Sequence, residues 1–252
     1  MKVKMMSYNY FASLYDCLTS NVDYKVRSEY ISDFFVDNSI PFGANILDLA
    51  CGTCSISIPL AKKGYNITGI DASQQMLEIA SNKAFDSGCN LSLLCSKMQD
   101  FDINDQFEVC ICTLDSINHL ENEKDVLNTF KNVYNCLKQD GLFIFDVNTI
   151  YKHNYVLADN TFVFEDDDYY LVWDNEKLDN NKIRILLDMF IYNGSSYDRY
   201  SEEFIEKAYS IECLNKLLIE SKFQILGVYE ELTKNKPKEN TQRVFFVCKK
   251  VI

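Results

Sequence analysis

Hydrophobic and polar positions follow two different periods along the chain. Short apolar runs typical of buried strands alternate with stretches whose apolar residues recur three or four positions apart, as in amphipathic helices. Because helices separate the strands, this pattern predicts βαβ units and a parallel sheet. The predicted strands are 45–49, 67–70, 91–94, 107–112 and 142–147, and the predicted helices are 24–36, 73–84 and 126–137.

The pattern changes after Asp146. Residues 162–210 contain several strand-like runs with polar turns and no helical period, and Asn180-Asn181 and Asn193-Gly194 are hairpin-type turns. We therefore predict an antiparallel β insertion that covers the substrate or forms a dimer contact. Its acidic run, residues 165–168, is either a solvated turn or an attraction for a cationic substrate.

The α/β pattern resumes with a predicted helix at 210–221 and strands at 224–231 and 243–249. The expected organisation is one large domain interrupted by the insertion. Its parts are 1–150 and 205–252 for the domain, with 1–40 as an N-terminal helical cap, and 151–204 for the insertion.

Composition narrows the class of protein. With 252 residues, 47% hydrophobic and 13% aromatic, the chain can bury a substantial core. A net charge of −12 disfavours nucleic acid, since phosphate binding relies on lysine and arginine. The N-terminus lacks a signal-peptide core, no apolar run reaches the roughly 20 residues of a membrane span, and ten cysteines suit a reducing compartment. We expect a cytoplasmic protein, monomer or homodimer.

The stretch Cys51-Gly52-Thr53-Cys54 allows two interpretations. As a Cys-x-x-Cys pair it would indicate redox chemistry or half of a metal site, but no second pair completes such a site and the two histidines, His119 and His153, are far apart. We expect no bound metal. Alternatively, it is a tight turn between a strand and a helix, in which the sulfurs are incidental.

Features around Gly52 favour a ligand-binding turn. Glycine permits positive φ and close approach of a ligand to the backbone. Pro59 belongs in the first turn of a helix, so that helix should begin near Ser55. Asp71 ends the second strand 19 positions after Gly52, which suits hydrogen bonding to ribose hydroxyls. Alternatively, Asp71 only caps the following helix.

The positions of the glycines indicate which kind of nucleoside cofactor the loop can bind. A dinucleotide fold has three glycines where this chain has Ala50, Gly52 and Cys54, and the Gly-Lys-Ser/Thr of a P-loop is absent. The loop therefore suits a cofactor without phosphates, of which S-adenosylmethionine is the obvious one.

The stretch LDLACGTCSISIPLAKKGYNITGIDASQQMLEIA resembles the first two motifs of class I S-adenosylmethionine-dependent methyltransferases. The likeness continues through FEVCICTLDSINHL, LNTFKNVYNCLKQDGLFIFDVNT and SIECLNKLLIESKFQILGVYEE, so it spans nearly the whole chain. Small bacterial methyltransferases of unsettled substrate and amino-sugar and glycine N-methyltransferases are similar. The resemblance implies a Rossmann-like seven-stranded, mostly parallel sheet of order 3-2-1-4-5-7-6, with strand 7 antiparallel and helices on both faces.

The resemblance also implies where the methionine part of the cofactor lies. Asp48, Ala50, Cys51 and Gly52 match residues that line it, and Tyr15 matches a tyrosine that closes over it. Cys54 replaces a common third glycine, so a modestly altered turn is expected.

Five further positions match the nucleoside side. Asp71 would hold the ribose hydroxyls, with Ala72 and Met76 near the adenine. Lys97 and Met98 stand where the family usually has Asp-Met, so Lys97 departs from the adenine-binding aspartate.

The loop after the fourth strand matches the methyl-transfer face, with Leu114 and Asp115 lining it, and Asp115 is a candidate catalytic residue. His119 in this loop is a candidate base or substrate-orienting residue, because a base is needed when the nucleophile arrives protonated. Alternatively, His119 is hydrogen-bonded at a helix start and Asp115 is a helix N-cap.

These observations favour a methyltransferase acting on a small-molecule amine or hydroxyl by in-line displacement. The alternatives are a non-catalytic S-adenosylmethionine-binding regulatory protein, an RNA or protein methyltransferase, and a Cys51/Cys54 redox protein.

Overall fold

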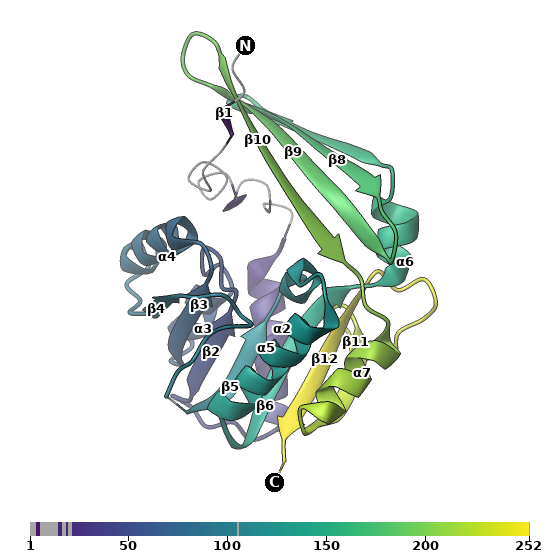
Figure 1. Cartoon of the computed structure of the whole chain (residues 1–252). Helices are drawn as coiled ribbons and strands as arrows, with labels where there is room; N and C mark the ends of the chain where they lie inside the picture. The colour runs from purple at the N-terminus through teal and green to yellow at the C-terminus, as the bar shows by residue number, and fades with distance from the viewer. Residues whose placement is uncertain (1–3, 6–14, 17–18, 20–21, 105, 252) are drawn as a thin grey trace.

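The computed structural model describes residues 4–5, 15–16, 19, 22–104 and 106–251 and contains two β-sheets (Figure 1). The larger sheet has the order β11-β12-β6-β5-β2-β3-β4, and only β12 runs antiparallel to its neighbours. Counted by its own seven strands, this order is 3-2-1-4-5-7-6, which confirms the predicted fold. The strands are β2 (Asn45–Leu49), β3 (Asn66–Asp71), β4 (Ser92–Cys95), β5 (Phe107–Cys112), β6 (Leu137–Asn148), β11 (Phe223–Glu230) and β12 (Arg243–Lys250).

Helices cover both faces of this sheet. The aromatic side of α2 packs with α3 on one face, whereas α5 and α7 pack on the other. In α5, Val126, Phe130 and Val133 recur at helical spacing and are buried, while the Asn122 side chain caps the first turn by accepting the Asp125 N–H. The helices are α2 (Tyr24–Asp37), α3 (Ser57–Lys62), α4 (Gln74–Asp86), α5 (Glu123–Cys136) and α7 (Ile211–Glu220).

Several predicted boundaries were wrong by a few residues. The helix after the glycine loop begins at Ser57 rather than Ser55, with Pro59 still in its first turn, where its missing N–H leaves no bond unmade. The predicted helix at 126–137 begins earlier because Asn122 caps it. β6 begins directly at Leu137, five residues before the predicted start at 142, so Gly141 lies within the strand.

The second sheet is the predicted antiparallel insertion, with order β1-β10-β9-β8-β7. It stands over the carboxyl ends of the parallel strands (Figure 1), and we call it the roof sheet. Its first strand comes from the N-terminus and pairs in parallel with β10, a contact that the sequence did not predict. Its parts are β1 (Lys4–Met5), β7 (Thr161–Asp166), β8 (Tyr169–Lys177), β9 (Lys182–Tyr192) and β10 (Tyr197–Lys207), reached through α6 (Ile150–Lys152) and the π-turn η2 (His153–Leu157).

Turn chemistry explains the hairpins of the roof sheet. Asn180 and Asn181 both have positive φ, 60° and 59°, as a two-residue turn matching strand twist requires. Gly194, φ 94°, serves the next hairpin. β7 is the outer strand, and the acidic run 165–168 is exposed where β7 turns into β8.

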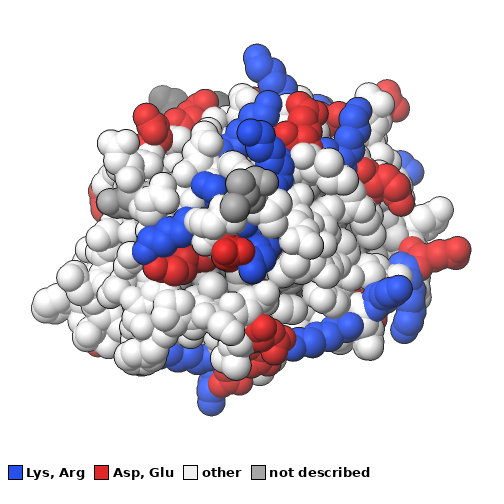
Figure 2. All heavy atoms as spheres, turned by 90° about the horizontal axis from the view of Figure 1, so that it is seen from below, with Lys and Arg blue, Asp and Glu red and all other residues white. Residues whose placement is uncertain are grey.

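The face seen from below in Figure 2 carries interspersed acidic and basic side chains rather than one broad basic surface. No helix among the described residues is long and apolar enough to span a bilayer.

Candidate active site

The glycine loop after β2 alternates in backbone handedness. Ala50, Gly52 and Cys54 have φ of 58°, 52° and 60°, the left-handed region that glycine tolerates best. The Cys54 side chain is buried against Ile58 and Ala80. Cys54 therefore adopts the glycine-like conformation, and its packing offsets the backbone strain.

Asp71 connects the ends of two neighbouring strands. One carboxylate oxygen accepts the Gly52 N–H at 2.8 Å, and the other accepts the Ser73 N–H at 2.8 Å. The side chain of Ser73, not that of Asp71, caps α4. Burial raises the pKa of Asp71, against the opposing effect of these hydrogen bonds. The spacing of 19 residues thus corresponds to direct contact with the loop.

Asp48 is a second acidic residue under the loop. Its side chain is 2% exposed and accepts the Ser57 hydroxyl at 2.6 Å. Burial raises the pKa of Asp48 to about 7, opposed by the Ser57 hydrogen bond, while the nearby Asp71 raises it further. The Asp48 carboxyl therefore stays protonated to a higher pH in the folded chain than in the unfolded chain.

Asp48 should make stability fall with rising pH. The unfolded chain loses this proton near pH 4 and the folded chain near pH 7, so between these values the folded state binds more protons and stability declines. Asp48→Asn removes this decline. From pH 5 to pH 8, the free energy of unfolding of the variant should rise by about 2 kcal/mol relative to that of the wild type, as measured by urea unfolding. An identical pH slope in both proteins would contradict the assignment.

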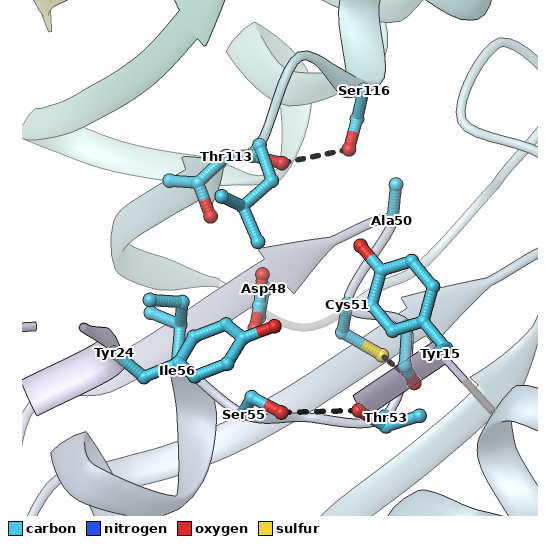
Figure 3. A pocket seen from close by; sticks show the side chains of 12 residues that line it. Tyr15, Tyr24, Asp48, Ala50, Cys51, Thr53, Ser55, Ile56, Thr113 and Ser116 are labelled. Carbon is cyan, nitrogen blue, oxygen red and sulfur yellow. Dashed lines mark hydrogen bonds between the residues drawn. The ribbon is translucent and has the colours of Figure 1, made fainter. Parts of the chain in front are cut away.

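Two tyrosines stand over the glycine loop and the Asp48 carboxylate (Figure 3). A Cβ built on Gly52 would lie 3.9 Å from the Tyr15 ring, so backbone and ring face each other with little between them. The hollow bounded by Tyr15, Tyr24 and the loop holds about 30 Å³, room for one or two waters. A bound nucleoside therefore requires the tyrosines to shift.

Asp16 ties the N-terminal segment to this loop. Its carboxylate accepts the Thr53 hydroxyl at 2.7 Å and the Lys83 ammonium at 2.6 Å, and Lys83 also donates to Ser55 at 2.8 Å. The side chains are partly exposed, so the link is weak enough to open.

The cofactor implied by the resemblance fits these residues. The left-handed turn at Gly52 presents backbone without a Cβ, and Asp71 stands at the adjoining strand end. Asp48, Ala50 and Cys51 line the same hollow. Asp71 would hold ribose hydroxyls, and Tyr15 would cover the methionine end.

The residues predicted to lie near the adenine are more dispersed. Ala72 and Lys97 are exposed after β3 and β4, whereas Met76 is buried in α4 and Met98 is partly buried against the core. None of these four lines the hollow beside Gly52.

The thiols of the loop do not resemble a redox pair. Hydrogen bonding to Cys54 and then burial raise the pKa of Cys51 well above the ordinary thiol value, which disfavours the reactive thiolate. A Cβ on Gly69 would lie 2.8 Å from the Cys51 sulfur, so Gly69 in β3 makes room for that side chain. Among the described residues, no group of three or more candidate ligands could hold a metal ion.

The turn after β5 is held by a buried carboxylate. Leu114 and Asp115 both have positive φ, 59° and 55°, and their N–H groups donate to Asp146 at 2.9 and 2.8 Å. Asp146 is fully buried in β6. Asp115 occupies the N-cap position of the short turn Ser116–His119, as the alternative predicted, but its side chain makes no capping hydrogen bond.

A cation from the reversed strand completes this turn. Arg243, at the start of β12, pairs with Asp115 at 2.8 Å and with Asp146. On the far side of Asp146, Arg27 from α2 approaches at 3.4 Å and also pairs with Glu231. Sequence reasoning missed both arginines, although an aspartate within the apolar run FIFDVN was a signal that a buried charge needs partners.

The Asp115 carboxylate is thereby kept ionised. Burial acts to raise its pKa, but Arg243 and the charges of Lys152 and His119 bring the pKa below its ordinary value. Asn148 donates a further hydrogen bond at 2.6 Å. Asp115 is thus an acceptor with its lone pairs largely occupied, which does not suit a general base.

A larger cavity of about 510 Å³ lies between this turn and the roof sheet, within the range of small-molecule sites. Tyr15 and Leu114 line both this cavity and the hollow beside Gly52, so the two adjoin. The polar lining comprises Asp115, His119, Asn148, Lys152, Glu202, Glu206 and Arg243, and much of the apolar lining comprises Leu157, Phe162, Phe164, Leu171, Trp173, Leu187 and Phe204.

His119 lies where the polar and the apolar lining of the cavity meet. It is exposed in the turn η1 (Ser116–His119), its ring lies 5.2 Å from that of Phe204, and Nε2 lies 3.8 Å from Glu206. His153, which is far from His119 in the sequence, is buried with Nε2 3.6 Å from the same carboxylate.

Comparison with known proteins agrees with this geometry. Over 247 residues the chain is 35% identical to a Bacillus subtilis (strain 168) protein named as the methyltransferase YqeM, covering 97% of this chain and 98% of that protein. A crystal structure of an S-adenosylmethionine-dependent methyltransferase from Clostridium acetobutylicum has a TM-score of 0.89 at 35% identity, covering 97% of this chain and 99% of that one.

Two further matches are more distant or shorter. A glycine/sarcosine N-methyltransferase from Aphanothece halophytica is 27% identical over 234 residues, covering 91% of this chain and 85% of that protein. Residues 46–141, from β2 into the first half of β6, match the methyltransferase domain family. The chain therefore belongs to the class I S-adenosylmethionine-dependent methyltransferases, and S-adenosylmethionine is its cofactor.

Proposed function

We propose that the protein methylates a small-molecule amine or hydroxyl bound beneath the roof sheet. The observation that carries this proposal is the cavity of about 510 Å³ that adjoins the glycine loop at Tyr15 and Leu114. Because the roof sheet covers it, the cavity suits an enclosed small acceptor better than a folded RNA or protein. The roof sheet then serves as the substrate cover.

Bound S-adenosylmethionine supplies an electrophilic methyl group. The chain's own residues align the acceptor and exclude water, and alignment accounts for much of the rate of an in-line displacement. His119 faces the cavity beside Leu114 and is the proposed acceptor of a proton from the nucleophile. Glu206, 3.8 Å from His119, would stabilise the resulting charge on the ring.

The test begins with calorimetric binding of S-adenosylmethionine and its demethylated product. Radiolabelled methyl transfer is then measured into two fractions of a cell extract, an ultrafiltrate of small molecules and the retained macromolecules. We expect label in the ultrafiltrate, and a rate reduced about a hundredfold in His119→Phe, which keeps a ring against Phe204 but removes both nitrogens.

Other results would favour the alternatives. Label confined to the retained fraction would indicate an RNA or protein acceptor, and removal by ribonuclease or protease would tell these apart. Binding without any transfer would favour a regulatory protein, and absence of binding would refute the cofactor role proposed for Gly52 and Asp71.

A further inference from the structure

Two carboxylates face the acceptor cavity from the roof sheet without a lysine or arginine partner. Glu202, Phe204 and Glu206 alternate along β10, so their side chains share one face of the strand, and all three line the cavity. Among the described residues, no lysine or arginine nitrogen lies within 4.0 Å of either carboxylate. The carboxylates on this side of the cavity are therefore faced by two histidines, His119 and His153 beside Glu206, rather than by a lysine or arginine in direct contact.

The cations that line the cavity are occupied on its opposite side. Arg243 is held by Asp115 and Asp146, and Lys152 donates to the Asn148 side chain at 2.9 Å. These contacts hold both positive charges at the turn after β5, although Lys152 remains close enough to Glu206 for their charges to attract.

Glu206 is the more buried of the two carboxylates. It is 5% exposed, and its Oε2 atom has no hydrogen-bond partner. His153 lies 3.6 Å away, and its Nδ1 atom must donate to the Asn181 carbonyl at 3.1 Å, so the ring is already anchored from behind. An unpaired buried carboxylate oxygen is costly, and a ligand that donates to it removes that cost.

Glu202 is in a similar position four residues earlier on β10, two repeats of the pleat away, with Phe204 between the two glutamates. Its Oε2 atom is buried without a partner, and burial raises the pKa of Glu202 to about 7. Asp188 on β9 shows the contrast, because Arg199 and Ser201 donate to it and its pKa is lowered. The roof sheet thus supplies a cationic partner to Asp188, which does not line the cavity, but none to Glu202, which does.

The remainder of the cavity wall is apolar and aromatic. The rings of Phe162 and Trp173 meet edge to face at 5.9 Å, and Phe164 lies 6.5 Å from the same indole. Leu171 and Leu187 line the same wall. A ligand that fills this space therefore needs an apolar body in addition to its polar end.

We propose that the cavity binds a small amine in its ammonium form, with N–H groups donating to Glu202 and Glu206. Its apolar body packs on Phe162 and Trp173. An ammonium has several donors and a positive charge, whereas a hydroxyl donates once and leaves the second carboxylate unpaired. The inference rests on the proposed function and narrows its acceptor from amine or hydroxyl to amine.

Matched probes test this recognition by binding rather than turnover. Phenethylamine and cyclohexylmethylamine are compared with the corresponding alcohols by calorimetry, with and without S-adenosylhomocysteine. We expect each amine to bind at least about tenfold more tightly than its alcohol. Near pH 7, binding should also release protons, because an ammonium beside Glu202 lowers the pKa of that carboxyl.

Isosteric variants assign the effect to these residues. Glu202→Gln and Glu206→Gln should each lose about tenfold in amine affinity, with a smaller loss of alcohol affinity, because a neutral hydroxyl gains less from a carboxylate. Glu203→Gln is the matched control, because Glu203 is exposed on the opposite face of β10. Melting temperatures of all three variants identify any failure to fold.

Two results would overturn the inference. One is that neither amine binds more tightly than its alcohol in the wild type, and the other is that the preference persists in both cavity variants. Failure of S-adenosylhomocysteine to bind would refute the proposed function instead, and the measurements without it would still decide the amine preference.

Discussion

Gly52→Val is expected to abolish cofactor binding in a chain that still folds. A β-branched residue at φ 52° is strained, and its Cβ would enter the space between the loop backbone and the Tyr15 ring. The Gly52 N–H also donates to Asp71, so a distorted loop displaces the proposed ribose-binding carboxylate as well. We expect calorimetry to show at least about a hundredfold loss of S-adenosylhomocysteine affinity, or 2.7 kcal/mol.

Gly88→Val is the matched control. Gly88 follows α4 with φ 67°, and a Cβ there would have no neighbour within 4 Å. Both variants incur a similar backbone strain of about 1–2 kcal/mol, which urea unfolding should register in each. If Gly88→Val weakened cofactor binding as much as Gly52→Val, the loss would reflect general destabilisation and not the ligand cradle.

Asp146→Asn should cause a large loss of stability. Each carboxylate oxygen of Asp146 accepts one backbone N–H and faces one guanidinium: Oδ1 meets Asp115 and Arg243, and Oδ2 meets Leu114 and Arg27. An amide has only one oxygen, so its NH₂ group would face two donors in either orientation. Breaking a buried ion network on one side costs about 3–5 kcal/mol, which urea unfolding at pH 7 should detect.

The control for this substitution lies on the same strand. Asp140 is exposed and pairs with Lys249 at 3.1 Å, so Asp140→Asn should change the unfolding free energy by less than about 1 kcal/mol. A similar, small effect in both variants would show that the Asp146 network contributes little. The loss of stability in Asp146→Asn relative to the wild type should also depend little on salt, because the buried pairs that it removes are poorly screened.

Local pattern predicted the alternating strands and helices and the parallel sheet, whereas the family resemblance supplied the strand order. The apolar runs at β2, β5 and β6 are buried on both faces, so they appear in the sequence as continuous hydrophobic segments. Boundaries were less accurate because caps determine them, as Asn122 does for α5. The pairing of Lys4–Met5 with β10 could not be predicted, since two residues carry no recognisable period.

The candidate site also has a part that local sequence predicted and a part that it did not. The spacing predicted Gly52 and Asp71 as residues of one nucleoside site, and the structure adds a direct hydrogen bond between them within a local βαβ unit. Arg243 and Glu206 reach the site from distant parts of the chain, so only tertiary structure brings them to Asp115 and His119. Arg243 and Glu206 lie in β segments, where the neighbouring residues did not indicate that these charged side chains are buried.

The exposed acidic turn of the roof sheet has a consequence for behaviour in concentrated solution. β7 is an outer strand, and the backbone groups along such an edge can pair with another chain. The carboxylates of residues 165–168 place like charges at the end of this edge in every copy. Mutual repulsion therefore opposes strand-to-strand aggregation, so the run protects the long hairpins from self-association.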